Sequence, residues 1–204
     1  GTSGVAARSR MNELLARAAM AARWLGGSGL AGFVMPYYPN QAASQFNVTA
    51  GTFSYSPVGS AVQWDIHFQW DKPLTKLMRV MSGRLLAVSV DIRIDSPTLG
   101  QHVAVELGDG NAESLFVPFG FATGICALSD NLGFTYKYSA FYNPKGESNI
   151  LWNDPALKID WRVNNPIVSP RDQAAQIFDA WLKTPESKLF TMEASRRFGA
   201  GGVE

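Results

Sequence analysis

The first regular pattern along the chain is a helical stripe of apolar residues near residues 11–25. Apolar side chains recur every three or four positions, while Arg10, Arg17 and Arg23 fall outside the stripe. Ser9 is of the type that caps the start of a helix, and the run Gly26–Gly29 is of the type that ends one. The stripe predicts a helix that packs over a sheet or against a partner subunit. Its members are Met11, Leu14, Leu15, Ala18, Ala22 and Leu25.

From Gly29 onward the pattern changes to short apolar runs, and in Val88–Ile92 apolar and polar residues alternate. This period of two is typical of antiparallel strands with one buried face. Turn-forming pairs such as Ser82-Gly83 and Asp109-Gly110 separate the runs, so that strands recur about every ten residues. That spacing predicts a sandwich or barrel rather than βαβ units. The predicted strands include residues 45–49, 61–68, 85–92, 102–107, 114–117 and 134–138.

The C-terminal part predicts a helix followed by a tail. Asp172–Leu182 carries its apolar residues largely on one side, as an amphipathic helix does. The glycine-rich end after Phe198 predicts fraying. We therefore divide the chain into an N-terminal tail and helix (1–30), a β domain (31–185) and a C-terminal tail (186–204).

Composition favours a folded domain and weighs against polyanionic partners. Of the 204 residues, 46% are hydrophobic and 17% are charged, which is enough to bury a core. The 18 Lys and Arg residues against 17 Asp and Glu residues give a formal net charge of +1, unlike a nucleic-acid surface or a polybasic membrane anchor. No apolar run reaches the roughly 18–20 residues of a membrane span. We therefore expect a cytoplasmic protein with no nucleic-acid or membrane partner.

Several motifs follow one another between residues 62 and 178. Ile66–Gln69 reads IHFQ, and Lys76–Gly83 is followed by Val88–Arg93; further on come Val117–Ala122 (VPFGFA) and Trp152–Leu157 (WNDPAL). Together these segments resemble the dTDP-4-dehydrorhamnose 3,5-epimerase family. The resemblance implies a mainly β, cupin-type jelly-roll sandwich or barrel with short C-terminal helices. It also implies a homodimer that acts on a small-molecule substrate without a metal or an organic cofactor.

The reaction of that family removes a proton from the carbon beside a ketone and returns one on the opposite face. This chemistry needs a base, an acid across the ring, and a cation or donor at the enolate oxygen. His67 fits the base, because an ordinary pKa of about 6.5 lets a neutral imidazole accept a proton. The resemblance assigns Asp172 as the carboxylate that orients His67, Tyr136 as the acid and Lys76 as the partner of the enolate oxygen.

Each of these residues also has an ordinary structural interpretation. Asp172 is suited to cap the helix after Pro170, Tyr136 to be a core aromatic, and Lys76 to be a solvated strand residue. His102 matches no functional position of the family and is expected on the surface. The remaining candidates, all for substrate binding, are Gln69, Tyr142, Trp64, Phe119, Thr123 and Arg79.

Departures from the family pattern bear on substrate recognition. Trp64 stands where the family has an arginine expected to contact a diphosphate, and Thr123 stands where it has a second pocket histidine. Neither replacement can supply the charge-assisted hydrogen bonds of a cation. We therefore hypothesise a substrate that is less anionic or is held differently. The alternative is that another arginine compensates and the substrate is still a nucleotide sugar; the candidates are Arg79, Arg84 and Arg162.

A metal-dependent cupin is the natural rival on this fold, and it commonly uses several imidazoles with a carboxylate. His67 and His102 are the only histidines of the chain, so a three-histidine site within one chain is impossible. Cys126 is the only cysteine, which excludes an internal disulfide and a cysteine-rich zinc site. The sequence thus predicts an epimerase of a dTDP-4-keto-6-deoxy sugar. It leaves open the isomerisation or cyclisation of a carbonyl substrate without a nucleotide, and a non-catalytic ligand-binding cupin.

Overall fold

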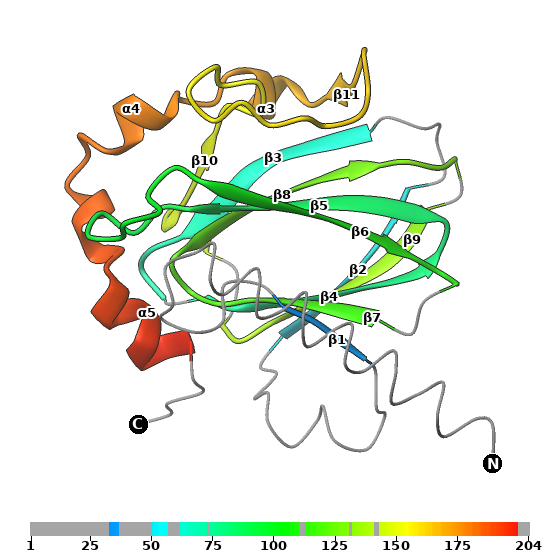
Figure 1. Cartoon of the computed structure of the whole chain (residues 1–204), viewed down its shortest axis with the longest axis horizontal. Coiled ribbons are helices and arrows are strands. Elements are labelled where there is room, and N and C mark those ends of the chain that lie inside the picture. The colour runs from blue at the N-terminus through cyan, green and yellow to red at the C-terminus, as the bar shows by residue number, and fades with distance from the viewer. Residues whose placement is uncertain are drawn as a thin grey trace.

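Two antiparallel sheets face each other across a shared core (Figure 1). The five-stranded sheet has the order β1 (Phe33–Pro36), β7 (Glu113–Val117), β4 (Lys76–Ser82), β9 (Leu132–Tyr138) and β2 (Ala50–Ser56). The six-stranded sheet has the order β10 (Glu147–Ile150), β3 (Val62–Gln69), β8 (Phe121–Ala127), β5 (Arg84–Asp91) and β6 (His102–Gly108), with β11 (Ile167–Val168) pairing in parallel with β3. The mainly β sandwich predicted from the sequence is confirmed.

The structure is a computed structural model, and it describes residues 33–36, 50–56, 62–72, 74–110, 113–130, 132–140 and 143–199. Within these ranges, the side chains of residues 33–36, 50–56, 62–65, 136 and 199 are not described. The helix predicted near residues 9–25 and the strand predicted over 45–49 lie outside the described residues. Among the described helices, none is long and apolar enough to cross a bilayer.

The space between the two sheets is filled by apolar side chains from both of them. Because successive residues of a strand point to opposite faces, every second residue of each central strand enters this inner core. Met78 and Val80 of β4 meet Leu85 and Ala87 of β5 there. The same alternation places Ser89 of β5 on the inner face, beyond Ala87. The inner face therefore turns from apolar to polar along these strands.

A second core lies on the outer face of the six-stranded sheet. Ile66 and Phe68 of β3 and Val88 of β5 pack there against aromatic residues of the C-terminal segment, among them Trp181 and Phe190. This segment, yellow to red in Figure 1, covers one side of that sheet. Because Ile66 and Phe68 are buried on the outer face, the residue between them, His67, points to the inner face.

The C-terminal segment differs from its prediction in two respects. The helix predicted over 172–182 is two short helices, α3 (Pro170–Gln173) and α4 (Phe178–Trp181). They are separate because the backbone of Gln176 between them bridges to Ile150 and Leu151 at the end of β10. The segment predicted as a tail from residue 186 forms a 3₁₀ turn, η1 (Glu186–Leu189), and a helix, α5 (Met192–Gly199).

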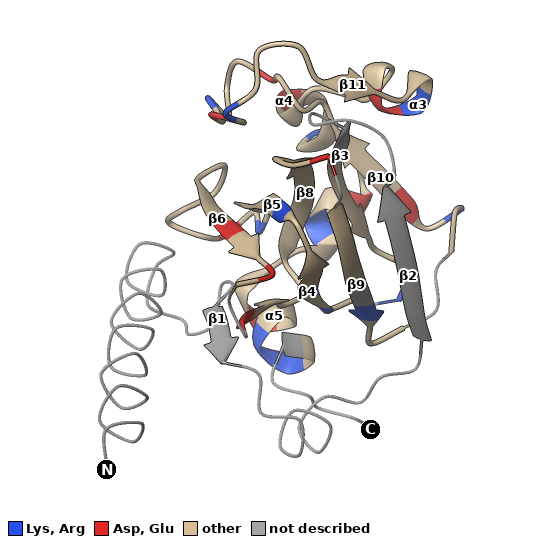
Figure 2. Ribbon diagram, turned by 90° about the vertical axis from the view of Figure 1, so that its right-hand side faces the viewer, with Lys and Arg blue, Asp and Glu red and all other residues tan. Residues whose placement is uncertain are grey.

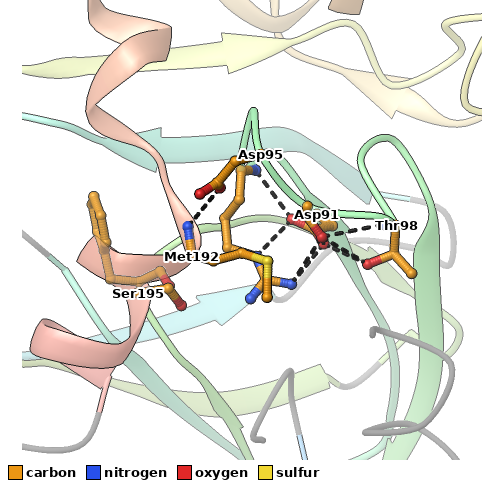
Figure 3. A network of polar contacts seen from close by, with 8 residues as sticks. Asp91, Asp95, Thr98, Met192 and Ser195 are labelled. Atoms are coloured by element: carbon orange, nitrogen blue, oxygen red, sulfur yellow. Dashed lines mark hydrogen bonds and ion pairs between the residues drawn. The ribbon is translucent and has the colours of Figure 1, made fainter. Parts of the chain in front are cut away.

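A buried polar network organises the turn that follows β5, and α5 begins beside this turn (Figure 3). Asp91, which is fully buried, accepts hydrogen bonds from Ser96, from Thr98 and from the backbone and guanidinium of Arg93. Burial works against the charge of Asp91, but these donors hold its pKa below the usual value. In the same region the backbone N–H of Met192 donates to Asp95. The Met192 contact holds the start of α5 close to this turn.

Candidate active site

His67 lies on β3 in a row of inward-facing residues that crosses four strands. Its register partners are Asn149 on β10 and Thr123 on β8, and Thr123 in turn pairs with Ser89 on β5. Directly paired residues share one face of a sheet, so these side chains start from the same level of the inner face. An irregularity in the pairing of β3 with β8 falls between Trp64 and His67. The His67 side chain keeps 21% of its surface exposed, so solvent reaches the ring.

Asp172 reaches His67 from α3. β11 pairs in parallel with the start of β3 and leads the chain into α3 at the end of the six-stranded sheet (Figures 1 and 2). Oδ1 of Asp172 is 3.2 Å from Nε2 of His67, and it also accepts from the Asn149 amide at 3.4 Å. The helix cap is Ser169, which accepts from the backbone N–H of Asp172. The interpretation of Asp172 as the cap is therefore wrong, and its carboxylate is engaged with His67.

Glu147 at the start of β10 is a member of this cluster that the sequence did not single out. Its Oε1 lies 3.2 Å from Nδ1 of His67, and its Oε2 pairs with the guanidinium of Arg171. The Glu147–Nδ1 contact has the distance of an ion pair without the alignment of a hydrogen bond. Each ring nitrogen of His67 thus faces a carboxylate.

The protonation of His67 follows from these contacts. Burial lowers the pKa of the imidazole, but the carboxylates of Asp172 and Glu147 outweigh burial and raise the pKa above 6.5. An ionised carboxylate only accepts hydrogen bonds, so Nε2 carries the hydrogen that points to Asp172. When the ring is neutral, its lone pair is therefore on Nδ1. The arrangement supports a base that acts through Nδ1 and whose protonated form is stabilised.

Lys76 connects the two sheets beside His67. Its ammonium group extends from β4 and donates to the backbone carbonyl of His67 at 2.9 Å. The side chain is almost completely buried, and this burial lowers the pKa of Lys76 to about 8, although the charge of Glu147 opposes the shift. Lys76 is therefore a cation at neutral pH that is close to losing its proton, not a solvated strand residue.

Two buried hydroxyl groups lie in the same cross-strand row as His67. The side chains of Thr123 and Ser89 are buried, and neither hydroxyl finds a hydrogen-bond partner among the described residues. A buried hydroxyl without a partner costs about 1–3 kcal/mol, so such groups commonly mark a position for a ligand oxygen or a water molecule. Thr123 was a predicted substrate-binding residue, whereas Ser89 looks like an ordinary strand residue in the sequence.

Three other predicted site residues do not join this cluster. Gln69 is buried, and its amide holds two loops by accepting from the Asn143 backbone and donating to the Lys72 carbonyl. Phe119 is in the outer core, where it stacks on Phe190. Arg79 is three positions after Lys76 on β4, so it projects from the opposite face of the five-stranded sheet.

For three predicted aromatic site residues the structure describes no side chain. Tyr142 is not a described residue, and the side chains of Trp64 and Tyr136 are likewise outside the described set. The backbone of Tyr136 on β9 pairs with Met78, two residues along β4 from Lys76. The predicted acid, Tyr136, is therefore on the strand that pairs with the strand of Lys76.

Two of the arginines considered as substitutes for missing cations are engaged at the edge of the six-stranded sheet. Arg84 and Arg162 both pair with Glu106 on the edge strand β6. All three side chains are in the solvent-accessible layer of the protein. The described cations that do contact the His67 cluster are Lys76 and Arg171.

A family model covers the part of the chain that contains this cluster. The model of dTDP-4-dehydrorhamnose 3,5-epimerase matches residues 31–180, which include the whole cluster. The chain belongs to the dTDP-4-dehydrorhamnose 3,5-epimerase family. Within the described residues of this family member, no group of three or more His, Cys, Asp and Glu side chains is placed to hold a metal ion.

Curated relatives carry the same family name. The chain is 37% identical over 158 residues to the dTDP-4-dehydrorhamnose 3,5-epimerase of Salmonella typhimurium, covering 75% of this chain and 86% of that protein. It is 35% identical over 147 residues to the enzyme of that name from Neisseria gonorrhoeae, covering 70% of this chain and 44% of that protein. The match to the Shigella flexneri protein of that name covers 57% of that protein. The chain thus spans about half the length of the Neisseria and Shigella relatives.

Solved structures confirm the cupin-like β fold. A 4-keto-6-deoxy sugar epimerase from the novobiocin gene cluster of Streptomyces spheroides is 29% identical with a TM-score of 0.69, covering 80% of this chain and 82% of that one. The Legionella pneumophila epimerase in complex with dTDP-4-keto-L-rhamnose is 32% identical with a TM-score of 0.67, covering 77% and 83%.

Proposed function

We propose that this protein is an epimerase that inverts one or both carbons beside the ketone of a dTDP-4-keto-6-deoxy sugar, without a metal or an organic cofactor. The observation that carries the proposal is the 3.2 Å contact between Nε2 of His67 and Oδ1 of Asp172. Beside it, the Lys76 ammonium donates a hydrogen bond to the backbone carbonyl of His67. A base with a fixed tautomer and a buried cation are two of the three groups that enolisation needs.

In the proposed reaction, the neutral His67 ring takes a proton from the carbon beside the ketone. The C–H bond breaks, the proton binds to Nδ1, and the electron pair moves into the enolate. Lys76 stabilises the negative oxygen, because a cation in a dry environment acts more strongly than one in water. Tyr136 returns a proton on the opposite face. Asp172 stabilises the imidazolium that forms.

Solvent deuterium exchange tests this proposal. In D₂O, the enzyme is expected to incorporate deuterium beside the ketone of dTDP-4-keto-6-deoxyglucose, and His67→Asn is expected to abolish the incorporation. His102→Asn is the matched control, since His102 lies on β6 and has no contact with the described cluster. Dialysis against EDTA should leave the exchange rate unchanged. Undiminished exchange in His67→Asn would remove His67 from the mechanism.

A second candidate keeps the proton chemistry but changes the substrate to a carbonyl compound without a nucleotide. Trp64 and Thr123 at two cation positions of the family pattern favour it, as does the engagement of Arg84 and Arg162 with Glu106. Isothermal titration with dTDP separates the two candidates, because micromolar binding is expected for a nucleotide-sugar enzyme and would exclude the second candidate.

Two further predictions belong to the proposed function. A homodimer is expected from the family, and sedimentation velocity on the purified chain would measure it. The cytoplasmic location expected from the sequence stays a prediction.

A further inference from the structure

Nδ1 of His67 is the nitrogen that has to accept the substrate proton, and Glu147 is already next to it. Asp172 engages Nε2, which leaves Nδ1 for chemistry. Oε1 of Glu147 lies 3.2 Å from Nδ1. Two lone pairs at that distance repel each other, whereas a proton between them is attractive on both sides. The Glu147 charge therefore favours the protonated ring, as an ion pair rather than through an aligned hydrogen bond.

A reaction with a base on one face and an acid on the other leaves both in the wrong protonation state. After each inversion, His67 carries an additional proton and the acid lacks one. The enzyme must return the first proton to solvent and recover the second before the next inversion in the same direction. Although part of the His67 ring is exposed, the Nδ1 atom itself is buried, so a proton on Nδ1 needs a path outward.

We propose that Glu147 is a positioning residue that binds the proton on Nδ1 of His67 between turnovers and passes it to solvent, which regenerates the base. The inference rests on the proposed function for the source of that proton. In the proposed step the Nδ1–H bond breaks, an O–H bond forms on Glu147, and the carboxyl group then releases the proton to water. Solvent returns one proton to the acid, so the cycle consumes none.

The surroundings of Glu147 fit this role. Its side chain is 12% exposed, against 6% for Asp172, so Glu147 is the more accessible of the two carboxylates on the ring. Its other oxygen pairs with Arg171, whose side chain is 54% exposed. The Arg171 contact holds the carboxylate at the boundary between the ring and solvent.

The charged groups that face His67 come from three elements. β10 contributes Glu147, α3 contributes Asp172 and, through Glu147, Arg171, and β4 contributes Lys76. On β8 the register partner is the uncharged Thr123. Removal of the Glu147 charge should therefore ease the loss of the His67 proton, because one of the two stabilising anions is gone and the Lys76 cation stays.

The first test is an NMR titration that needs no substrate. The chain has two histidines, so ¹³C-labelled histidine gives two ring signals, which His102→Gln assigns. In Glu147→Gln, the His67 titration is expected to move to lower pH while His102 stays in place. Glu106→Gln is the matched control, because Glu106 also pairs with arginine but far along the sheet on β6. An unchanged His67 titration in Glu147→Gln overturns the proposal.

The second test separates proton return from proton abstraction. In D₂O with dTDP-4-keto-6-deoxyglucose, Glu147→Gln should lower kcat about tenfold or more beyond any loss in single-turnover deuterium incorporation, because the weaker base slows abstraction while the lost proton path slows only turnover. Raising the concentration of an imidazole or formate buffer should restore kcat, since a small buffer can carry the proton. A kcat that does not respond to buffer overturns the role. Absence of label in the wild-type product would instead contradict the proposed substrate. The NMR titration would still show whether Glu147 interacts with the proton of His67.

Discussion

Asp172 lies 105 residues after His67 in the chain, yet its Oδ1 is 3.2 Å from Nε2 of the His67 ring. The two residues meet because β11 joins the start of β3 in parallel and the chain then turns into α3. Ser169 caps this turn and fixes the backbone of Asp172. The pairing is therefore built by long-range sheet contacts and one local cap.

Asp172→Asn should keep the fold and lose most of the activity. Asparagine has nearly the same shape, but it supplies no negative charge to stabilise the imidazolium, and its amide can hold the wrong tautomer. We expect kcat for deuterium exchange to fall about 10²- to 10⁴-fold. Asp179→Asn on α4 is the control, because Asp179 is an exposed acid on the neighbouring helix. A variant with wild-type kcat would contradict the role of Asp172.

Some of the strands, among them β3, β5 and β6, and the His67–Asp172 pair could be predicted, because their signals are local or carried by motifs. Glu147 could not be predicted in this way. It stands in an unremarkable run, Glu147–Ile150, and its position depends on β10 pairing with β3, some 80 residues earlier. β8 was likewise not singled out, since both of its faces are buried and the strand shows no alternation.

The C-terminal segment shows how tertiary contacts override a local pattern. An apolar face over 172–182 is what one helix would have, but the backbone of Gln176 pairs with the end of β10 and interrupts it. Residues 186–199 look like a tail because the chain there is polar and short. The buried Ser195, which donates to the carbonyl of Phe119, helps to hold them in place.

Lys76→Met should reduce activity and reveal the cost of a buried cation. The shift of the Lys76 pKa from 10.5 to about 8 corresponds to a cost on the order of 3 kcal/mol at neutral pH. That cost is present below pH 8 and disappears as the pH rises from 8 to 10.5, where the folded protein has lost the proton and the unfolded chain still holds it. The wild type should therefore gain stability relative to Lys76→Met over this range.

Urea unfolding at pH 7 and at pH 9.5 measures this difference, and Lys137→Met, on the exposed surface of β9, is the control. We expect kcat of Lys76→Met to fall by about 10²-fold or more, because the enolate loses its cation. A stability difference that is independent of pH would show that Lys76 keeps its ordinary pKa in the folded protein.

His67 should make stability depend on pH in the opposite direction. Its pKa is raised in the folded protein, so the folded state holds the proton more tightly than the unfolded chain. The stabilisation is fully present below pH 6.5 and is lost as the pH rises through the folded pKa. The difference in unfolding free energy between the wild type and His67→Gln should therefore shrink from pH 5.5 to 7.5. A constant difference across this window would contradict the raised pKa; His102 is present in both proteins and cancels.

Gly120→Ala should destabilise the fold without touching the His67 cluster. Gly120 has φ +102°, and a Cβ at this position would lie 2.8 Å from Cδ of Arg93 and 3.1 Å from Oγ of Ser195. Arg93 cannot retreat easily, because its guanidinium is bound to Asp91 and lies over the Phe121 ring. Backbone strain and overpacking together predict a loss of about 2–4 kcal/mol in the free energy of unfolding.

Gly110→Ala is the matched control for that prediction, because a Cβ at Gly110 meets no atom within 4 Å. Its unfolding free energy in urea should stay within about 1 kcal/mol of the wild type. The two variants differ in whether the new methyl group meets the Arg93 side chain and Oγ of Ser195 on α5. Equal stability of both variants would mean that the side chains of Arg93 and Ser195 yield to the new methyl group without cost.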